Sequence, residues 1–173
     1  MKSGWKLKAS IAIDFTMSNL PIEHLRSLHR QDFQRKGEMN QYEKAIYEVA
    51  GVIEQYAYEK DFVVYGFGGI PKYLKTYRSE KEVIKCWNLA GEIKSLADED
   101  QVNEKTVKGV MGILSIYHKA IRHTTLAGPT YFAGLLKRFK KRVDNDMSKD
   151  DGKSFYVMIL LTDGCIHDIK ETK

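Results

Sequence analysis

Two apolar runs near opposite ends of the chain each lead into an aspartate, and they restrict the fold more than any other feature. The first is LKASIAID, residues 7–14, and the second is SFYVMILLTDG, residues 154–164. Runs of this length and apolar content predict buried strands. The nearly unbroken apolar stretch 155–161 is typical of a central parallel strand that is covered on both faces.

Helical patterns separate these two strands along the chain. Asn40 and Glu43 form a predicted capping box, which starts a helix with the apolar stripe Tyr42, Ala45, Ile46, Val49, Ile53 and Tyr56. Strands that alternate with helices predict an α/β fold, with a doubly wound, mostly parallel sheet flanked by helices. A length of 173 residues is typical of one domain. The other predicted elements are helices at 107–121 and 131–143 and strands at 61–69 and 83–89.

The composition is that of an ordinary globular domain, with 43% hydrophobic and 29% charged residues. The chain has no run of about 18 apolar residues that could span a membrane. Its basic start, MKSGWKLKAS, lacks the apolar segment of a signal peptide. Cys86 and Cys165 are the only cysteines, so we expect reduced thiols in a cytoplasmic protein.

The net charge of +5 is concentrated in LKRFKKRV, residues 136–143. Phe139 and Val143 keep helical spacing within this stretch, so its five basic residues are predicted to form the solvated side of an amphipathic helix. A docking surface for phosphates is the alternative. No nucleic-acid partner is expected.

The residues that follow the first strand suggest a metal site. In parallel α/β sheets, ligands bind beyond the carboxyl ends of the strands, and Asp14 and Asp163 each follow an apolar strand. Thr16 and Ser18 alternate with Asp14, so the three side chains can point the same way in an extended turn. Such hard oxygen donors favour Mg²⁺, Mn²⁺ or Ca²⁺ over Zn²⁺. The alternative is an ordinary strand-to-loop junction whose hydroxyls bond the local backbone.

These motifs resemble a known family. The pattern D-x-[ST]-x-S after a first strand, a threonine in a later loop and TDG after a later strand resemble the von Willebrand factor A domain and its metal-ion-dependent adhesion site. Several blocks resemble the copine A-type domain in the same order: IAIDFTMSN, SLH, NQYEKAIYEVAGVIEQY, VYGFGGIP, LAGPTYFA and LLTDGCIHDIKET. The resemblance implies that the metal ligands are Asp14, Thr16, Ser18, Thr130 and Asp163.

The resemblance also implies a binding role. In A domains the hydroxyls tend to bind the metal directly, the aspartates often act through water, and an acidic residue of a protein partner completes the coordination. No nucleophile or base is needed, so we expect no enzyme. In copines, two C2 domains bind phospholipid in response to Ca²⁺, and the A domain recruits proteins. This chain contains no C2 domain, so membrane association, peripheral in the full-length protein, is expected only through domains outside it.

The resemblance places residues 1–173 in one domain that lacks its expected final strands. CIHDIKETK looks like the start of a helix that is cut short, so we expect a piece of a longer protein. A-type folds usually carry two further strands after TDG. Their absence would leave an incomplete sheet edge through which the chain could form an oligomer.

Other functions stay open at this point. A copine-like domain also occurs in RING-type ubiquitin ligases, and a Mg²⁺-dependent phosphohydrolase also places an aspartate after its first strand. Phosphohydrolase chemistry usually needs a second acidic group, for which Asp168 is the additional candidate. The spacing of the histidines fits no familiar zinc pattern, so these side chains are predicted to lie on the surface: His24, His29, His118 and His123.

Overall fold

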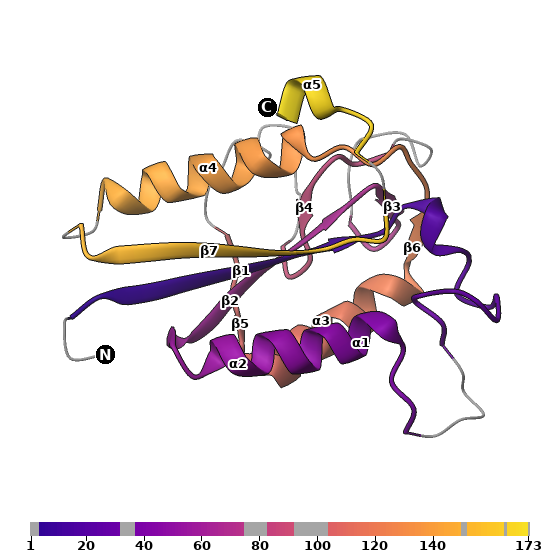
Figure 1. The fold of residues 1–173 in the computed structure, drawn as a ribbon, viewed down its shortest axis with the longest axis horizontal. Coiled ribbons are helices and arrows are strands. Elements are labelled where there is room, and N and C mark those ends of the chain that lie inside the picture. The colour runs from indigo at the N-terminus through magenta and orange to yellow at the C-terminus, as the bar shows by residue number, and fades with distance from the viewer. Residues whose placement is uncertain are drawn as a thin grey trace.

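The computed structural model describes residues 4–31, 37–74, 83–91, 104–149, 152–164 and 166–172, so Cys165 lies outside the described residues. A mixed, mostly parallel sheet lies between two layers of helices (Figure 1). This arrangement confirms the predicted α/β fold. Within the described ranges, none of the helices has both the length and the apolar character that a membrane span requires.

The main sheet is built around β1 (Lys6–Asp14), an interior strand. β1 pairs in parallel with β2 (Ala57–Phe67) on one side and with β7 (Ser154–Leu161) on the other. The two apolar runs that end in aspartates are therefore neighbours in the sheet. They run in the same direction, so their carboxyl ends meet at one edge.

Short strands complete the architecture. The strand predicted at 83–89 is only the two-residue β4 (Trp87–Asn88), which pairs antiparallel with β2. β5 (Val107–Lys108) also pairs antiparallel with β2. A separate two-stranded sheet joins β3 (Gly69–Pro71) to β6 (Thr124–Leu126).

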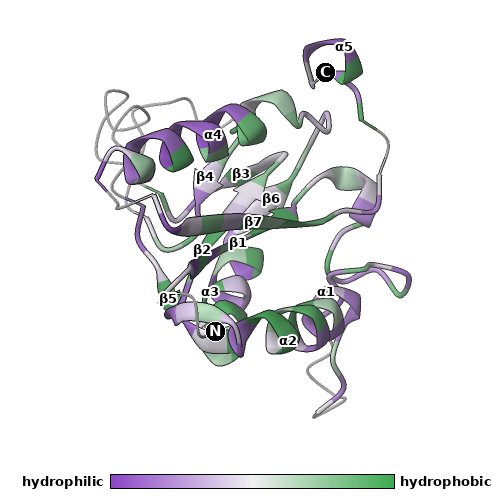
Figure 2. Cartoon of the chain, turned by 60° about the vertical axis from the view of Figure 1, so that its left-hand side comes forward, coloured by the Kyte–Doolittle hydropathy of each residue, from purple (hydrophilic) through white to green (hydrophobic). Residues whose placement is uncertain are grey.

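Helices cover both faces of the main sheet. Figure 2 shows the sheet between α4 (Ala133–Met147) on one side and a second layer of helices on the other. Two short helices follow the carboxyl ends of β1 and β7 along the chain. The elements opposite α4 are α1 (Gln41–Ala45), η2 (Ile46–Ala50), α2 (Gly51–Glu54) and α3 (Gly109–Arg122), and the two short helices are η1 (Met17–Asn19) and α5 (Ile169–Thr172).

Alternation along β1 supplies two cores, one for each face of the sheet. Ile11 and Ile13 belong to the core shared with α1 and α3. Ala12 belongs to the smaller core under α4, together with Phe132 and Leu135. Both faces of β1 are thus shielded from solvent, which fixes the position of the loop that follows Asp14.

The first helix differs from its prediction in one of its turns, which is π-helical and not α-helical. The capping box of Asn40 and Glu43 is present, but η2 is a π-helical turn. A π turn holds more residues than an α-helical turn, so it shifts the buried stripe along the sequence. Ala50 is therefore fully buried, whereas Val49, predicted to face the core, is 42% exposed.

β7 also differs from its prediction. Its residues were expected to be covered on both faces, but most are only half-buried and Phe155 is 60% exposed. β7 is an edge strand of the described sheet, because β1 is its one described neighbour. An edge position leaves its second row of backbone groups outside the sheet's hydrogen bonding.

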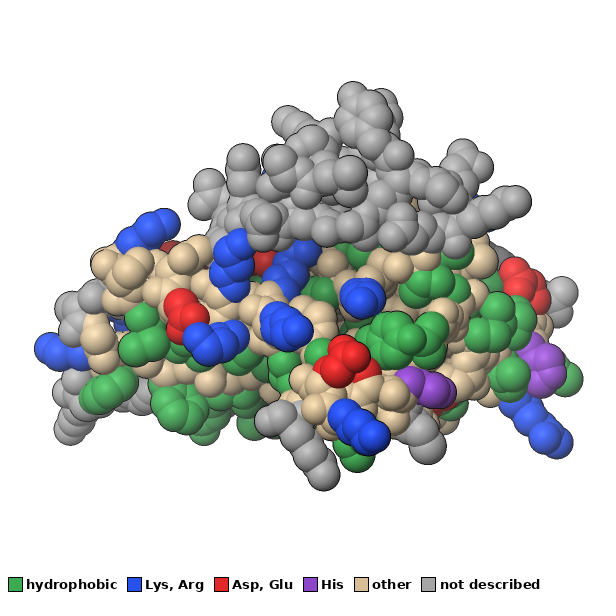
Figure 3. All heavy atoms as spheres, turned by 90° about the horizontal axis from the view of Figure 1, so that it is seen from above, with side chains coloured by type: hydrophobic (Ala, Val, Ile, Leu, Met, Phe, Trp, Pro, Cys, Tyr) green, Lys and Arg blue, Asp and Glu red, His purple; other side chains and the backbone are tan. Residues whose placement is uncertain are grey.

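The basic stretch on α4 is less solvated than predicted. Arg138 donates through Nε to Glu104 Oε1 at 2.7 Å and through Nη2 to Glu104 Oε2 at 3.2 Å. Arg142 is buried and donates to the hydroxyl of Ser10 in the sheet. Lys140 instead forms an exposed ion pair with Asp144. In Figure 3, which views this side of the molecule, basic side chains are interspersed with acidic and hydrophobic ones.

Candidate metal centre

The sheet brings the two aspartates to one edge. Asp14 is the last residue of β1, and Asp163 lies two residues beyond the end of β7. The parallel register pairs Ile13 with Leu161, so the two strands finish side by side. This is the carboxyl edge at which parallel α/β sheets bind ligands.

Asp14 is a fully buried carboxylate that accepts three hydrogen bonds. Its Oδ1 accepts from the backbone N–H of Thr16 at 2.8 Å and from the Thr16 hydroxyl at 2.6 Å. Its Oδ2 accepts from the Thr162 hydroxyl at 2.6 Å. The carboxylate is therefore fixed by both the loop after β1 and the residue after β7.

A chain of oxygen atoms links Asp14 to Asp163. Thr16 Oγ1 lies 2.9 Å from Ser18 Oγ, and the Ser18 hydroxyl donates to Asp163 Oδ1 at 3.0 Å. Ser18 and Asp163 are exposed, whereas Asp14 and Thr16 are buried. The group thus runs from a buried carboxylate to an exposed one, at the surface of the molecule.

Thr130 approaches the same place from the loop before α4. A Cβ placed on Gly164 would lie 3.7 Å from Thr130 Oγ1 and 3.8 Å from Ser18 Oγ, so both hydroxyls face Gly164. The Thr130 side chain does not cap α4. That helix is instead capped by Asp168, which accepts from the N–H groups of Phe132 at 3.0 Å and Ala133 at 2.9 Å.

His167 secures the backbone of Thr130. The His167 N–H donates to the Thr130 carbonyl at 3.0 Å, and the Thr130 N–H donates to His167 Nδ1 at 3.2 Å. The Thr130 side chain is buried, yet its hydroxyl forms no hydrogen bond with any described residue. That hydroxyl is therefore available to a ligand.

The electrostatics of the site call for positive charge. Burial raises the pKa of Asp14, against the hydrogen bonds from Thr16 and Thr162, and the nearby charge of Asp163 raises it further. Neither aspartate forms an ion pair with a described Lys, Arg or His. A bound cation would offset both the burial and the repulsion.

The donor set fits a hard divalent cation. The five residues that the sequence pattern singled out offer two carboxylates and three hydroxyls, gathered around Gly164 and the end of β1. Oxygen donors of this kind suit Mg²⁺, Mn²⁺ or Ca²⁺. The described residues contain no cluster of three or more His, Cys, Asp or Glu side chains that could hold a metal. Hydroxyl donors distinguish this site from such clusters.

The loop after β1 rests on a buried histidine. His29 was predicted to lie on the surface, but it is fully buried between the rings of Phe15 and Tyr42, with centroid distances of 5.5 and 4.0 Å. Its Nε2 lies 2.7 Å from the Asp14 carbonyl oxygen, and its Nδ1 lies 2.8 Å from the Tyr117 hydroxyl. The carbonyl only accepts, so Nε2 carries the proton. The neutral ring can then accept from Tyr117.

Burial keeps His29 neutral. It lowers the pKa of His29 to about 4, although the bond to the Asp14 carbonyl acts in the opposite direction. A second support runs beside it, because the Tyr42 hydroxyl donates to Asn19 Oδ1 at 2.8 Å and Asn19 Nδ2 donates to the Thr16 carbonyl at 3.2 Å. The spacing of the histidines gave no signal of this role, since it depends on tertiary packing.

Gly68, in the GFGG stretch, also shapes the loop. Its φ of 76° lies in the left-handed region that favours glycine. A Cβ at Gly68 would collide with the Thr16 side chain. The glycine therefore lets the end of β2 approach a proposed metal ligand closely.

Comparisons with known proteins agree with these motifs. The family model described as Copine matches residues 27–173. The protein BONZAI 1 of Arabidopsis thaliana is 33% identical over 173 residues, which cover 100% of this chain and 27% of that protein. BONZAI 2 of the same plant is 34% identical, with 26% of its length covered.

A nematode protein is also similar. Nicotinic receptor-associated protein 1 of Caenorhabditis elegans is 27% identical over 172 residues, which cover 99% of this chain and 24% of that protein. The chain therefore spans about a quarter of the length of the relatives it matches.

Proposed function

This chain belongs to the copine family, and on that premise we propose that it is a metal-dependent protein-binding module. Its ligands to a divalent cation are Asp14, Thr16, Ser18, Thr130 and Asp163. An acidic residue of a partner protein completes the coordination. The observation that carries the proposal is the gathering of these five oxygen-bearing side chains at one sheet edge. No described Lys, Arg or His side chain forms an ion pair with either of the two carboxylates.

The chemistry of the site favours binding over catalysis. Bound Mg²⁺, or Mn²⁺ or Ca²⁺, would act as a Lewis acid toward a carboxylate ligand. Asp168, the extra acidic group that a phosphohydrolase would need, is committed to the N-terminus of α4. Copines are not recognised as an enzyme family. We therefore assign the site no catalytic step.

The wider role is also a proposal. One relative is named for its association with a receptor, which supports a protein as the partner of this domain. We propose that the full-length protein is a copine-like, calcium-dependent phospholipid-binding protein, cytoplasmic and peripheral at the membrane. This domain would recruit partners there.

Calorimetric titration with Mg²⁺, Mn²⁺ and Ca²⁺ tests the metal site. The parent chain is expected to show saturable binding at one site. Asp14→Asn keeps the shape and one of the two accepting oxygens but removes the charge, so it should weaken binding by about 100-fold or more. Asp144→Asn, an exposed change on α4, is the matched control and should bind like the parent. A folded parent that binds no cation, or an Asp14→Asn variant with unchanged affinity, would refute the proposal.

A further inference from the structure

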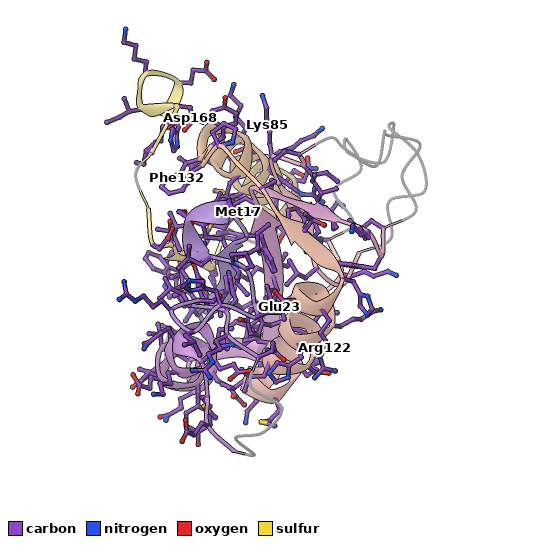
Figure 4. The ribbon with its side chains drawn as sticks, turned by 90° about the vertical axis from the view of Figure 1, so that its right-hand side faces the viewer. Met17, Glu23, Lys85, Arg122, Phe132 and Asp168 are labelled. Atoms are coloured by element: carbon purple, nitrogen blue, oxygen red, sulfur yellow. The ribbon has the colours of Figure 1, made fainter. Side chains whose placement is uncertain are left out.

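A groove adjoins the proposed metal centre. It has a volume of about 300 Å³ and lies between the loop after β1 and the segment that joins α3 to β6. We call it the Met17 groove, after the residue between the ligands Thr16 and Ser18. Figure 4 labels three residues that line it, Met17, Glu23 and Arg122, on the face turned to the viewer.

The Met17 groove and the metal centre are built on the same two chain segments. Thr16 forms a bridge with Ala127, whose N–H donates to the Phe15 carbonyl at 3.2 Å. The Met17 N–H in turn donates to the Ala127 carbonyl. The loop that carries Thr16 and Ser18 and the segment that leads to Thr130 are thereby joined. A ligand in the groove is held by the same two segments that carry the metal ligands.

The lining of the groove suits an apolar side chain. Met17, Ile22, Ile121 and Leu126 contribute apolar surface. Met17 is 49% exposed, and its flexible thioether can adapt to the shape of a ligand. The Thr124 hydroxyl, in the same wall, is buried and has no hydrogen-bond partner among the described residues.

We propose that the Met17 groove binds an apolar side chain of the same partner segment whose acidic residue reaches the metal. The occupant is an extended segment of a partner protein, with Asp or Glu at the metal and Leu, Ile, Met or Val within three positions of it. Extended chain advances about 3.3 Å per residue, so three positions reach roughly 10 Å from the residue at the metal. The groove begins at Met17, which lies between Thr16 and Ser18 in the chain. This inference rests on the proposed function.

Charge favours this occupant over a basic or neutral one. The chain carries a net charge of +5, and a divalent cation would add to it locally. An acidic residue meets the cation, and the apolar residue beside it fills a groove in which one acidic and one basic residue, Glu23 and Arg122, balance each other and the other lining residues are uncharged. The specificity of the module would then come from the groove, because any carboxylate can complete the metal's coordination.

Selection from a display library of random 12-residue peptides tests the inference. The whole 173-residue chain serves as bait in Mg²⁺, and bound peptides are eluted with EDTA. The enriched peptides are expected to share an acidic residue and an apolar residue at a constant spacing of three or fewer. Replacing that apolar residue by serine should weaken binding at least about tenfold, as expected for the loss of one buried aliphatic side chain.

A change in the groove gives the complementary test. Thr125 is exposed, lines the groove and lies outside the metal ligands. Thr125→Trp should fill the groove and weaken the selected peptide at least about tenfold, with an unchanged Mg²⁺ affinity. The same bulk at an exposed position on α2, Val52→Trp, should leave peptide binding unchanged.

Two kinds of failure can be told apart. A parent chain that does not bind Mg²⁺ overturns the proposed function and the groove with it. Selected peptides with an acidic residue but no apolar position, or equal binding to Thr125→Trp, overturn the groove alone. An empty selection on Mg²⁺-loaded protein also overturns it. Self-association that Thr125→Trp abolishes would identify a second copy as the occupant instead.

Discussion

The candidate metal centre has a buried half and an exposed half. Asp14, Thr16 and Thr130 have 0%, 2% and 3% of their surface exposed, whereas Ser18 and Asp163 are exposed. The buried half is held in place by hydrogen bonds within the fold, from Thr16 and Thr162 to the Asp14 carboxylate and between His167 and the Thr130 backbone. The exposed half is joined to it by the contacts of a single hydroxyl, that of Ser18.

This difference indicates how a cation would bind. The buried half is preorganised, because its side chains keep their positions without a metal. The exposed half gains little from its solvent-facing hydrogen bonds, so it would become ordered only around the ion. Metal affinity should therefore depend on both halves, whereas the stability of the metal-free fold should depend on the buried half alone.

The largest effect is expected at the support of the buried half. His29→Leu removes the donor to the Asp14 carbonyl and the acceptor for the Tyr117 hydroxyl. Leaving buried polar groups without partners should lower the free energy of unfolding by about 2–4 kcal/mol. Urea denaturation of the metal-free chain measures this. His24→Leu is the matched control in the same loop. It is exposed and should stay within about 0.5 kcal/mol of the parent.

His29→Leu also tests whether stability and metal affinity are linked through the buried half. A variant that still folds should bind Mg²⁺ about tenfold more weakly, because the Asp14 backbone is no longer fixed. His29→Gln can restore the donor to the carbonyl and should recover part of the affinity. A large loss of stability with unchanged Mg²⁺ affinity would show that His29 serves the fold and not the site.

An intermediate effect is expected at Asp168, which caps the helix after Thr130. Burial acts to raise the pKa of Asp168, but the hydrogen bonds from Phe132, Ala133 and Thr172 outweigh it and lower the pKa. The stabilisation by ionised Asp168 is therefore fully present at pH values above its pKa in the unfolded chain, near 3.8. It is lost as the pH falls through the lower pKa that Asp168 has in the folded chain. Asp168→Asn should cost about 1–2 kcal/mol at pH 7.

Denaturation as a function of pH checks the sign. The difference in the free energy of unfolding between the parent and Asp168→Asn should be constant near neutral pH and should shrink below about pH 4. Asp144→Asn, with its exposed ion pair to Lys140, should change stability by less than about 0.5 kcal/mol at any pH. A difference in the free energy of unfolding between the parent and Asp168→Asn that increased on acidification would contradict the role of Asp168 as an ionised helix cap.

The sequence predicted which side chains lie together at this site better than it predicted what supports them. Asp14 and Asp163 could be placed at one edge because each follows an apolar run, and parallel strands finish on the same side. The burial of His29 could not be predicted, because it depends on rings that come from three separate segments. Spacing in the sequence carries no signal for such a contact.

The fold shows the same division between local and tertiary information. The capping box of Asn40 and Glu43 was predicted because it is a local pattern. The π turn that follows it buries Ala50 in place of Val49, and the apolar periodicity favoured the opposite outcome. Arg142 looked solvent-exposed in a basic stretch, yet it reaches Ser10 in the sheet. For Ala50 and Arg142, unlike the capping box, the outcome depends on packing against segments distant in the sequence.

The smallest effect on stability is expected in the exposed half, where Ser18→Ala removes one hydroxyl. The metal-free chain should unfold within about 0.5 kcal/mol of the parent, while Mg²⁺ affinity falls about tenfold. Thr16→Val removes the equivalent hydroxyl from the buried half. It should cost about 1–3 kcal/mol, because Asp14 Oδ1 loses a buried donor at 2.6 Å. Equal losses of stability in the two variants, measured by urea denaturation, would show that the two halves are not distinct.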